Sequence, residues 1–348
     1  MFDSIWRIFT DDVGIDLGTA NTKVVISGFN EIISEPSVVA QNANDGSILA
    51  VGAEAKKMLG RTPSYIKAVR PLRDGIISDF DATKNMVSYF INLAYKKSNK
   101  FFKIPRPRTI IGVPSSATEI GRKAVYDAAK SVGSREVFII EEPMAAAIGS
   151  GLPVSEAVGS MIVDIGGGTT DIAIISLGGI VIDKTIAVAG DLMDQAIVKY
   201  VREKYNLLIG ERIAEDAKIN IGSAYHTTKT KIFEIRGRDL IQGIPRILNI
   251  TSNEIREAIS PQLQMIAEAI SEALEECPPD LLADITASGI MLAGGGAMIE
   301  GIKDYFEDKT KMKFIVSDDP IFAVVKGTKK LLEDIDLLSK IKGSFQTF

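Results

Sequence analysis

Two short segments with the same layout, far apart in the chain, restrict what this sequence can fold into. Each runs from apolar residues to an aspartate, then through a turn rich in glycine and threonine, and back into apolar residues: "VGIDLGTANTKVVI" at 13–26 and "VDIGGGTTDIAII" at 163–175. This order is typical of a strand, a tight turn and a second strand. Such a turn lets the backbone bend sharply, and its N–H groups can surround an anion. Either segment alone fits an ordinary hairpin, but the repeat, with Asp16 and Asp164 in matching places, favours two related phosphate-binding hairpins.

The length of the chain agrees with such a duplication. At 348 residues it is longer than an average domain, so we expect two halves that each bury a core. The net charge of −5 gives no general attraction for nucleic acid, and no apolar run reaches the length of a membrane-spanning helix. The single cysteine, Cys277, favours a reducing cytoplasm. The single histidine, His226, argues against a histidine-based metal site, so any catalysis must rest on carboxylates, hydroxyls and a bound ion.

The order of the expected elements predicts, in each half, an α/β fold with a mostly parallel sheet covered on both faces. The first half is expected to contain the hairpin, a loop-rich part at 31–81, a helix at 82–95, a strand ending at Pro114, a helix within 116–133, the strand "EVFIIEEP" and a helix of small residues. The second half is expected to contain a hairpin at 161–186, helices at 191–205 and within 210–222, a β-rich insertion at 227–250, a long helical region at 252–276 and a strand leading into "AGGGAM". Pro261 is expected to break the long helical region or to begin a helix inside it.

Two phosphate hairpins that face each other from two halves would hold a triphosphate in the cleft between them. Asp16 and Asp164 would then flank a Mg²⁺ ion through waters, because Mg²⁺ prefers octahedral oxygen ligands and keeps part of its hydration shell. The third glycine-rich turn, "AGGGAM" at 293–298, would let a flat base lie against the backbone.

Five segments, in this order, resemble the MreB/Mbl family of bacterial actins, within the actin/Hsp70/sugar kinase superfamily: "GIDLGTANTK", "EEPMAAAIGSGLPV", "VDIGGGTTD", "AGDLMDQAIVKYVREKYNLLIGERIAE" and "LAGGGAMI". The resemblance covers nearly the whole chain. It implies an actin-like ATPase fold, with two related lobes built on ribonuclease H-like sheets around a cleft that takes ATP and Mg²⁺. The implied lobes are 1–155 with 325–348, including a small subdomain at roughly 33–76, and 156–324, including a small subdomain at roughly 191–256.

The resemblance also implies a set of nucleotide-binding residues. They are Gly18, Thr19, Ala20 and Asn21 in the first phosphate turn, Gly166, Gly167, Gly168 and Thr169 in the second, and Glu215, Lys218, Gly295, Gly296 and Ala297 near the ribose and base. Lys23 departs from the family pattern, in which this position is more often apolar. From the second strand of the hairpin its ammonium group could reach a β-phosphate, or it could simply face solvent.

Hydrolysis needs a water molecule aligned with the γ-phosphate, because positioning and charge stabilisation supply most of the rate in phosphoryl transfer. Glu142, in "EEPM", matches the family's water-orienting glutamate; the alternative is a solvated carboxylate at a strand end. Its neighbour Glu141 should point the opposite way if the strand continues. Thr169 is the second catalytic candidate, through a hydroxyl that helps to hold the water. Asp171 stands where a glutamate is common in the family, and this difference could alter the hydrolysis rate.

Two segments predict contact with a membrane. In "MFDSIWRIF" the apolar side chains recur at helical spacing and would share one face: Phe2, Ile5, Trp6 and Phe9. Tryptophan at an amphipathic end favours the membrane interface, although the segment could instead pack on its own domain. In "YKKSNKFFKIPRPR", Phe101 and Phe102 lie among lysines and arginines, each of which contributes on the order of 1 kcal/mol near an anionic leaflet. A filament with many copies would bind firmly through effective concentration.

Three functions fit these features. The first is a polymerising cytoskeletal ATPase that hydrolyses ATP slowly. The resemblance implies paired antiparallel protofilaments of this chain, with "SATEIGRKAV" at the pairing surface. The filaments would lie in the cytoplasm on the anionic inner face of the cell membrane. Morphogenetic membrane proteins are further expected partners, and nucleic acid is not an expected partner. The second is a small-molecule kinase of the same superfamily, for which no separate polar motif supplies a substrate pocket. The third is a chaperone ATPase, which would need a peptide-binding domain after residue 348.

Overall fold

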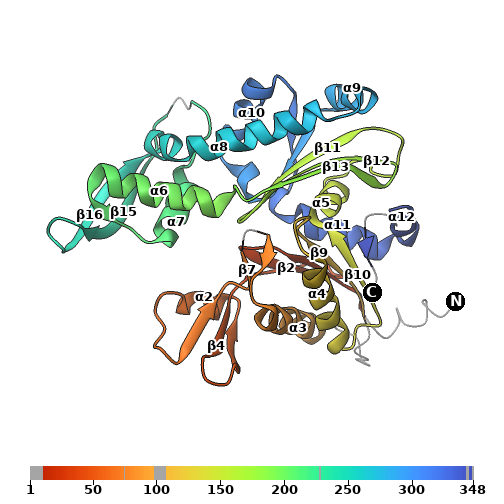
Figure 1. The fold of residues 1–348 in the computed structure, drawn as a ribbon, viewed down its shortest axis with the longest axis horizontal. Coiled ribbons are helices and arrows are strands. Elements are labelled where there is room, and N and C mark those ends of the chain that lie inside the picture. The colour runs from red at the N-terminus through yellow and green to blue at the C-terminus, as the bar shows by residue number, and fades with distance from the viewer. Residues whose placement is uncertain (1–10, 74, 98–106, 227–228, 342–344, 347–348) are drawn as a thin grey trace.

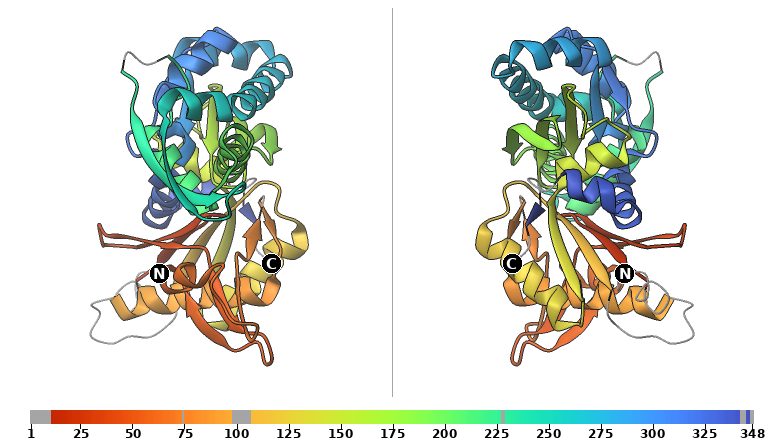
Figure 2. Two further views of the ribbon diagram at one scale, coloured as in Figure 1. Left: turned by 90° about the vertical axis from the view of Figure 1, so that its left-hand side faces the viewer. Right: turned by 90° about the vertical axis from the view of Figure 1, so that its right-hand side faces the viewer.

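The computed structural model describes residues 11–73, 75–97, 107–226, 229–341 and 345–346. They form two lobes, each built around one sheet, which lie one above the other in Figure 1. The two further views in Figure 2 show the same stacking.

The sheet of the first lobe has the order β19-β10-β9-β1-β2-β3. Its strands are β1 (Val13–Leu17), β2 (Asn21–Ile26), β3 (Ile32–Pro36), β9 (Arg108–Val113), β10 (Glu136–Glu141) and β19 (Phe345–Gln346). The side chains of β1 and β9 are all buried, as expected for central strands covered on both faces. One face packs against α3 (Phe80–Lys97) and α4 (Glu119–Ser131), and the other against α5 (Glu142–Gly149) and α11 (Ala323–Glu333).

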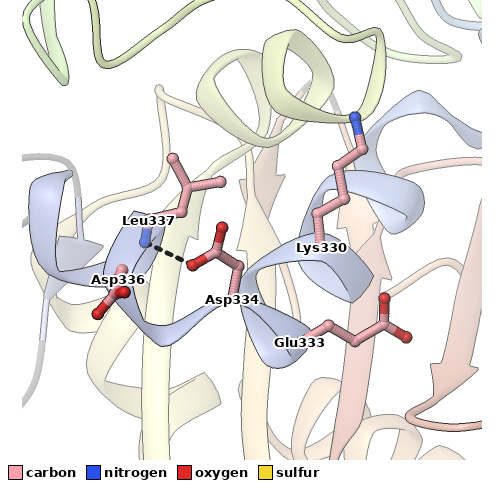
Figure 3. A pocket seen from close by; sticks show the side chains of 5 residues that line it. All are labelled: Lys330, Glu333, Asp334, Asp336 and Leu337. Carbon is pink, nitrogen blue, oxygen red and sulfur yellow. Dashed lines mark hydrogen bonds between the residues drawn. The ribbon is translucent and has the colours of Figure 1, made fainter.

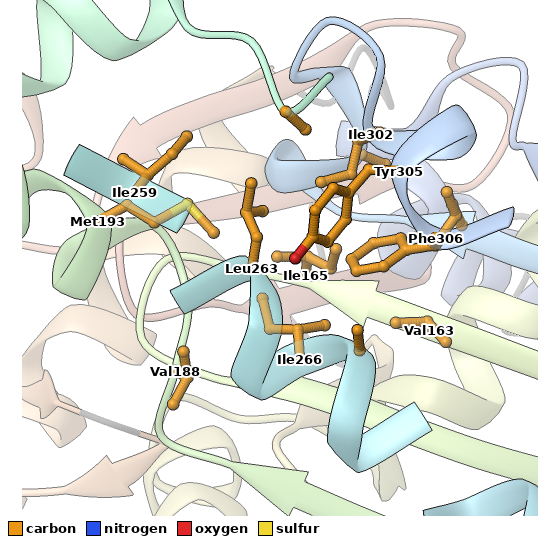
Figure 4. Close-up of a cluster of buried hydrophobic side chains, with 14 of the residues drawn as sticks. Val163, Ile165, Val188, Met193, Ile259, Leu263, Ile266, Ile302, Tyr305 and Phe306 are labelled. Carbon is orange, nitrogen blue, oxygen red and sulfur yellow. The ribbon is translucent and has the colours of Figure 1, made fainter. Parts of the chain in front are cut away.

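The sheet of the second lobe has the order β13-β12-β11-β17-β18. Its strands are β11 (Ser160–Ile165), β12 (Thr170–Ser176), β13 (Gly179–Ile186), β17 (Ile290–Ala293) and β18 (Phe314–Val316). The helices of this lobe are α6 (Gly190–Tyr205), α7 (Glu211–Ile221), α8 (Ser252–Glu275), α9 (Pro279–Ser288) and α10 (Ile302–Thr310). Figure 4 shows how side chains from β11, α6, α8 and α10 meet in one apolar cluster.

The two sheets repeat the same order of pairing, in keeping with the repeated hairpins of the sequence. The prediction of mostly parallel sheets is wrong, because each hairpin and the strand beside it pair antiparallel and only the later strands pair parallel. In each, a hairpin pairs antiparallel with a third strand at one side, β1-β2-β3 and β11-β12-β13. At the other side, the first strand of the hairpin pairs parallel with a later strand, which pairs parallel with the next: β1-β9-β10 and β11-β17-β18. Asp16 and Asp164 therefore occupy equivalent positions, at the ends of the two central strands.

Each lobe also carries a small sheet on the same side of the molecule (Figure 1). The first lobe has β4 (Val39–Asn42), β5 (Ile48–Val51), β6 (Ile66–Val69) and α2 (Ala53–Met58), followed by the hairpin of β7 (Leu72–Arg73) and β8 (Ile76–Ile77). The second lobe has β14 (Leu207–Leu208), β15 (Ile232–Asp239) and β16 (Pro245–Thr251). The prediction of a loop-rich part at 31–81 is therefore wrong, because these strands are too short to show a clear alternating pattern. The predicted domain boundaries stay a prediction.

Two further expectations about elements are wrong. Pro261 lies inside the continuous helix α8; it is exposed, so water can take the place of its missing N–H partner at the carbonyl one turn earlier. The strand "EVFIIEEP" ends at Glu141, and Glu142 is the first residue of α5, with Pro143 in the first turn, where proline is well tolerated. No helix among the described residues combines the length and apolarity needed to cross a membrane.

Helices α5 and α11 lie between the two sheets and join the lobes (Figure 1). They touch backbone to backbone: a Cβ atom on Gly149 would lie 1.8 Å from the carbonyl oxygen of Ala323, and one on Gly327 would lie 1.8 Å from that of Ala145. Glycine is thus required at both positions. The short helices η1 (Gly295–Met298), η2 (Pro320–Phe322) and α12 (Ile335–Lys340) complete the described fold.

Candidate functional site

A cavity of about 370 Å³ lies between the lobes, within the size range of small-molecule sites. Most of the residues predicted to bind nucleotide, metal or the attacking water line it: Asp16, Gly18, Thr19, Ala20, Asn21, Lys23, Glu142, Asp164, Gly166, Gly167, Thr169, Glu215, Lys218, Gly295 and Gly296. Two predicted residues, Gly168 and Ala297, are buried beside the cavity and are not among its lining residues. The side chain of Ala297 packs instead into the core of the second lobe.

The two glycine-rich turns touch each other across the cleft. A Cβ atom on Gly167 would lie 2.8 Å from the Cβ of Ala20, closer than such atoms approach in real structures. The second turn is held from behind by the start of α6, where the N–H of Gly190 donates to the carbonyl of Gly166 (3.2 Å) and that of Asp191 to the carbonyl of Gly167 (2.7 Å). A ligand in the cavity therefore meets both turns at once.

Four carboxylates lie close together in the cavity wall. Asp16, Glu142, Asp164 and Asp171 all line it, and all are buried. Burial, followed by repulsion from Asp171 and Asp16, raises the pKa of Asp164 to about 7. Burial and the neighbouring carboxylates raise the pKa of Glu142 well above its usual value. The Oε1 atom of Glu142 is buried and has no hydrogen-bond partner within the described part of the chain. This concentration of negative charge favours a cation.

Lys23 supplies positive charge to this cluster. Its Nζ atom lies 2.6 Å from Oδ2 of Asp16, the residue opposite it in the first hairpin. Burial lowers the pKa of Lys23, but the attraction of Asp16 and of the other carboxylates outweighs burial, so that the pKa is raised. Its side chain is only 12% exposed, so the alternative of a solvent-facing lysine is wrong. Its contact with a phosphate stays a prediction.

Thr169 and Asp171 form a hydrogen-bonded pair at the end of the second turn. The Oγ1 atom of Thr169 donates to Oδ2 of Asp171 at 3.0 Å, and the hydroxyl of Thr185 on β13 donates to Oδ1 at 2.6 Å. Burial raises the pKa of Asp171 to about 6, although hydrogen bonds from both threonines oppose this rise. The side chain of Thr169 therefore has a defined orientation at the cavity wall.

Helix α7 and the third glycine-rich turn form a further part of the cavity wall. Lys218 on α7 is paired with Asp194 at 2.8 Å and donates to the carbonyl of Gly190 at 2.8 Å, which ties α7 to α6. Gly294, at φ 80°, begins the turn, and a Cβ there would lie 2.3 Å from Oδ1 of Asp164. The absence of a side chain at Gly294 thus lets the third turn approach the acidic cluster.

Several lining residues were missed by the sequence analysis: Gly190, Asp191, Met193, Asp194, Ile219, Gly222, Gly294, Met298, Ile299, Pro320, Ile321 and Val324; Asp171 was noted there only as a departure from the family. The segment "AGDLMD" carried a usable signal, because small and acidic residues begin a helix directly after a strand. The apolar members carried none, since their presence here depends on how distant helices pack.

Asp16 and Asp164 fit a Mg²⁺ ion. Both are buried carboxylates at the cavity wall, and burial, followed by repulsion from Asp171 and Asp16, raises the pKa of Asp164, an effect that a bound cation would oppose. The described residues contain no group of three or more His, Cys, Asp or Glu side chains arranged to hold a metal ion. Two carboxylates are the usual number where Mg²⁺ is bound mainly by waters and substrate phosphates.

The six residues predicted to contact a membrane, Phe2, Ile5, Trp6, Phe9, Phe101 and Phe102, lie outside the described residues. Their role stays a prediction.

A second pocket, of about 540 Å³, lies at α11 and α12 (Figure 3). Two of its polar groups serve the fold: Asp334 accepts a hydrogen bond from the N–H of Leu337 at the start of α12, and Lys330 donates to the carbonyl of Ile148 on α5. The cavity between the lobes is therefore the candidate site.

The chain is similar to known proteins in both sequence and fold. The family model described as "MreB/Mbl protein" matches residues 10–340. The cell shape-determining protein MreB of Escherichia coli (strain K12) is 47% identical over 334 residues, which cover 95% of each chain. Crystal structures of MreB5 of Spiroplasma citri bound to ADP and to AMPPNP match with TM-scores of 0.87 and 0.86, at 37% and 36% identity, covering 94% and 96% of this chain and 98% of the other chain in both cases. A MamK double helical filament matches with a TM-score of 0.78 at 25% identity, over 93% of this chain and 99% of that one.

Proposed function

The chain belongs to the MreB/Mbl protein family and has its actin-like fold, and from this premise we propose that it is an ATP-binding bacterial actin whose membrane-associated filaments govern cell shape. The observation that carries the proposal is the contact between two equivalent glycine-rich turns, one from each lobe, in a cavity that four buried carboxylates also line. This arrangement suits a triphosphate chain and its cation. Because both turns would hold the same ligand, a change from triphosphate to diphosphate would alter the relative position of the lobes.

The proposed ligand is an adenine nucleotide. The MreB5 structures contain ADP and AMPPNP, and MreB5 shares this fold at 37% identity. In our proposal the backbone N–H groups of the two turns hold the phosphates, Lys23 contributes a point charge, and the region around Glu215, Lys218 and Gly295 takes the ribose and base. Mg²⁺ would be held by Asp16 and Asp164, through waters, and would supply charge neutralisation of the phosphates.

The proposed reaction is slow hydrolysis of the γ-phosphate, linked to assembly. Glu142 presents a buried carboxylate oxygen that has no hydrogen-bond partner among the described residues, and Thr169 presents a hydroxyl of fixed orientation. A water molecule between them would be held in line with the phosphate. A kinase role is not favoured by the family match, because its members are named for cell shape.

The proposed partners are further copies of this chain and the anionic inner membrane surface. MamK, a relative in fold at 25% identity, forms a double helical filament. For antiparallel pairing we propose the surface of α4, where Ile120 is 73% exposed. We propose that the apolar residues at 2–9 and 101–102 contact the inner face of the membrane. The filament would then lie in the cytoplasm, where morphogenetic membrane proteins could bind it.

Sedimentation of the purified full chain tests this function. We expect ATP with Mg²⁺ to move the protein into the pellet, and anionic vesicles to increase the pelleted fraction. Replacing Trp6 and Phe9 by Ser should reduce the vesicle effect and leave the ATP effect unchanged. The variant Glu142→Ala should bind a fluorescent ATP analogue normally but release phosphate at least about 10-fold more slowly. A chain that binds no adenine nucleotide, or that stays monomeric under all of these conditions, would contradict the proposal.

A further inference from the structure

We propose that Asp171 is a positioning residue: by accepting a hydrogen bond from the Thr169 hydroxyl, it leaves that hydroxyl only its lone pairs to offer, as a hydrogen-bond acceptor, to the water that attacks the γ-phosphate. The inference rests on the proposed ATPase function and deepens it. It starts from one contact, the 3.0 Å hydrogen bond from Oγ1 of Thr169 to Oδ2 of Asp171.

This contact determines what the Thr169 hydroxyl can offer to a water molecule. A threonine hydroxyl has one proton to donate and two lone pairs that accept, whereas an ionised carboxylate only accepts. Once its proton is committed to Asp171, Thr169 can interact with a water only by accepting a proton from it. A free hydroxyl could instead donate to the water and occupy the lone pair that must attack phosphorus.

Glu142 supplies the second acceptor. Its buried Oε1 atom lacks a partner within the described residues and lines the same cavity as Thr169. A water that donates one O–H to Glu142 and the other to Thr169 has both protons engaged. Its lone pair is then free to face the phosphate, which is the orientation that in-line attack requires.

The side chains of this pair are held on several sides. Thr185, opposite Asp171 in the sheet, donates to the other carboxylate oxygen at 2.6 Å, so that Asp171 cannot rotate without losing a bond. The methyl group of Thr169 faces Gly75, where an added Cβ would lie 2.7 Å from it. Asp171 itself is 2% exposed. The hydroxyl of Thr169 is therefore kept on the side of Asp171.

The test is a double-mutant cycle on phosphate release within ATP filaments of the full chain, with ATP affinity measured in parallel. We expect Asp171→Ala to slow phosphate release by roughly 10-fold or more and to leave the ATP dissociation constant within about 2-fold. Thr169→Val should have a similar effect. The double variant should be no slower than the slower single variant, because both changes remove the same orienting bond. Asp171→Glu should recover part of the rate.

Two further variants complete the test. Asp308→Ala is the matched control: it removes an exposed carboxylate on α10 that pairs with Lys311 and does not line the cavity, and it should leave the rate unchanged. If Asp171→Ala does not bind ATP, Asp171→Asn replaces it, because the amide keeps the volume but leaves one of the two threonine hydroxyls without an acceptor; we then expect at least a roughly 3-fold slower release.

The outcomes separate this inference from the function on which it rests. Wild-type filaments that release no phosphate overturn the proposed function and this inference with it. Two results would overturn the inference alone, provided that wild-type filaments release phosphate. One is that the Asp171 variants release phosphate as fast as the wild type. The other is that the rate reductions of the two single variants multiply in the double variant.

Discussion

The Nζ atom of Lys23 lies 2.6 Å from the Oδ2 atom of Asp16, and both largely buried side chains line the cavity between the lobes. The ammonium group is thus a built-in cation in a place where carboxylates from both lobes converge. It offsets part of their repulsion before any ligand arrives. A Mg²⁺ ion that enters the cavity must compete with Lys23 for the carboxylates, and a phosphate can interact with the ammonium group of Lys23.

Replacing Lys23 by Leu leaves Asp16 as a buried charge without its partner. We expect the nucleotide-free protein to lose about 3 kcal/mol of unfolding free energy, because a buried ion pair that loses one member is strongly destabilised. We also expect ATP affinity to fall by about 3-fold to 10-fold and its dependence on Mg²⁺ to become steeper. Urea unfolding in EDTA and titration with a fluorescent ATP analogue measure both effects. Lys199→Leu, which changes an exposed lysine, is the control. Unchanged affinity would contradict a role for Lys23 in phosphate binding.

The acidic cluster predicts an unusual pH dependence in the protein without nucleotide and metal. The pKa of Asp164 is raised from 3.8 to about 7 in the folded state, so between these values the folded protein holds a proton that the unfolded chain has released. Rising pH therefore favours unfolding across this window. We expect Asp164→Asn to flatten this fall and to stabilise the protein at pH 8 by about 1–3 kcal/mol. Urea unfolding at several pH values in EDTA measures it, and equal slopes for the two proteins would speak against the shift.

How far the sequence predicts this molecule depends on whether a feature is local. The hairpins and their aspartates follow from glycine-rich turns between apolar runs, which need no knowledge of distant contacts. The order of the strands does not, because it depends on pairing between segments far apart in the chain. The position of Glu142 was harder to predict, because the sequence does not show that the chain turns from strand to helix at that residue. The bracing of the second turn by Asp191 was missed for the same reason: it joins residues that only the packed lobe brings together.

Two ion pairs close the side of the cleft that carries the small sheets. Arg70 of the first lobe lies 3.4 Å from Asp191 at the start of α6, and Lys56 on α2 lies 3.5 Å from Glu215 on α7. Both pairs are partly exposed, so each contributes at most about 1 kcal/mol and is weakened by salt.

We therefore expect Arg70→Ala to speed release of a bound fluorescent nucleotide by about 2-fold to 5-fold at low salt and to reduce the salt dependence of that rate. Stopped-flow displacement by excess ATP measures the rate. Lys57→Ala is the control, since Lys57 pairs with Glu54 on its own helix. Equal release rates for Arg70→Ala and the wild type at low salt would show that the pair does not hold the cleft.

The contact between the two glycine-rich turns makes the strictest prediction. In Gly167→Ala the new methyl group would lie 2.8 Å from the Cβ of Ala20, and both atoms are fixed to backbone, so the turns must move apart. We expect ATP affinity to fall by about 10-fold or more, because the phosphates can no longer meet both turns at their proper spacing.

Adding Ala20→Gly to this variant should restore much of the affinity. The remaining neighbours of the new methyl group, the N and Cα atoms of Ala20, would lie 3.4 and 3.6 Å away, which is close to ordinary contact. Titration of the single and double variants with a fluorescent ATP analogue decides the matter. If Gly167→Ala binds as tightly as the wild type, or if Ala20→Gly brings no recovery, the spacing of the turns does not control binding.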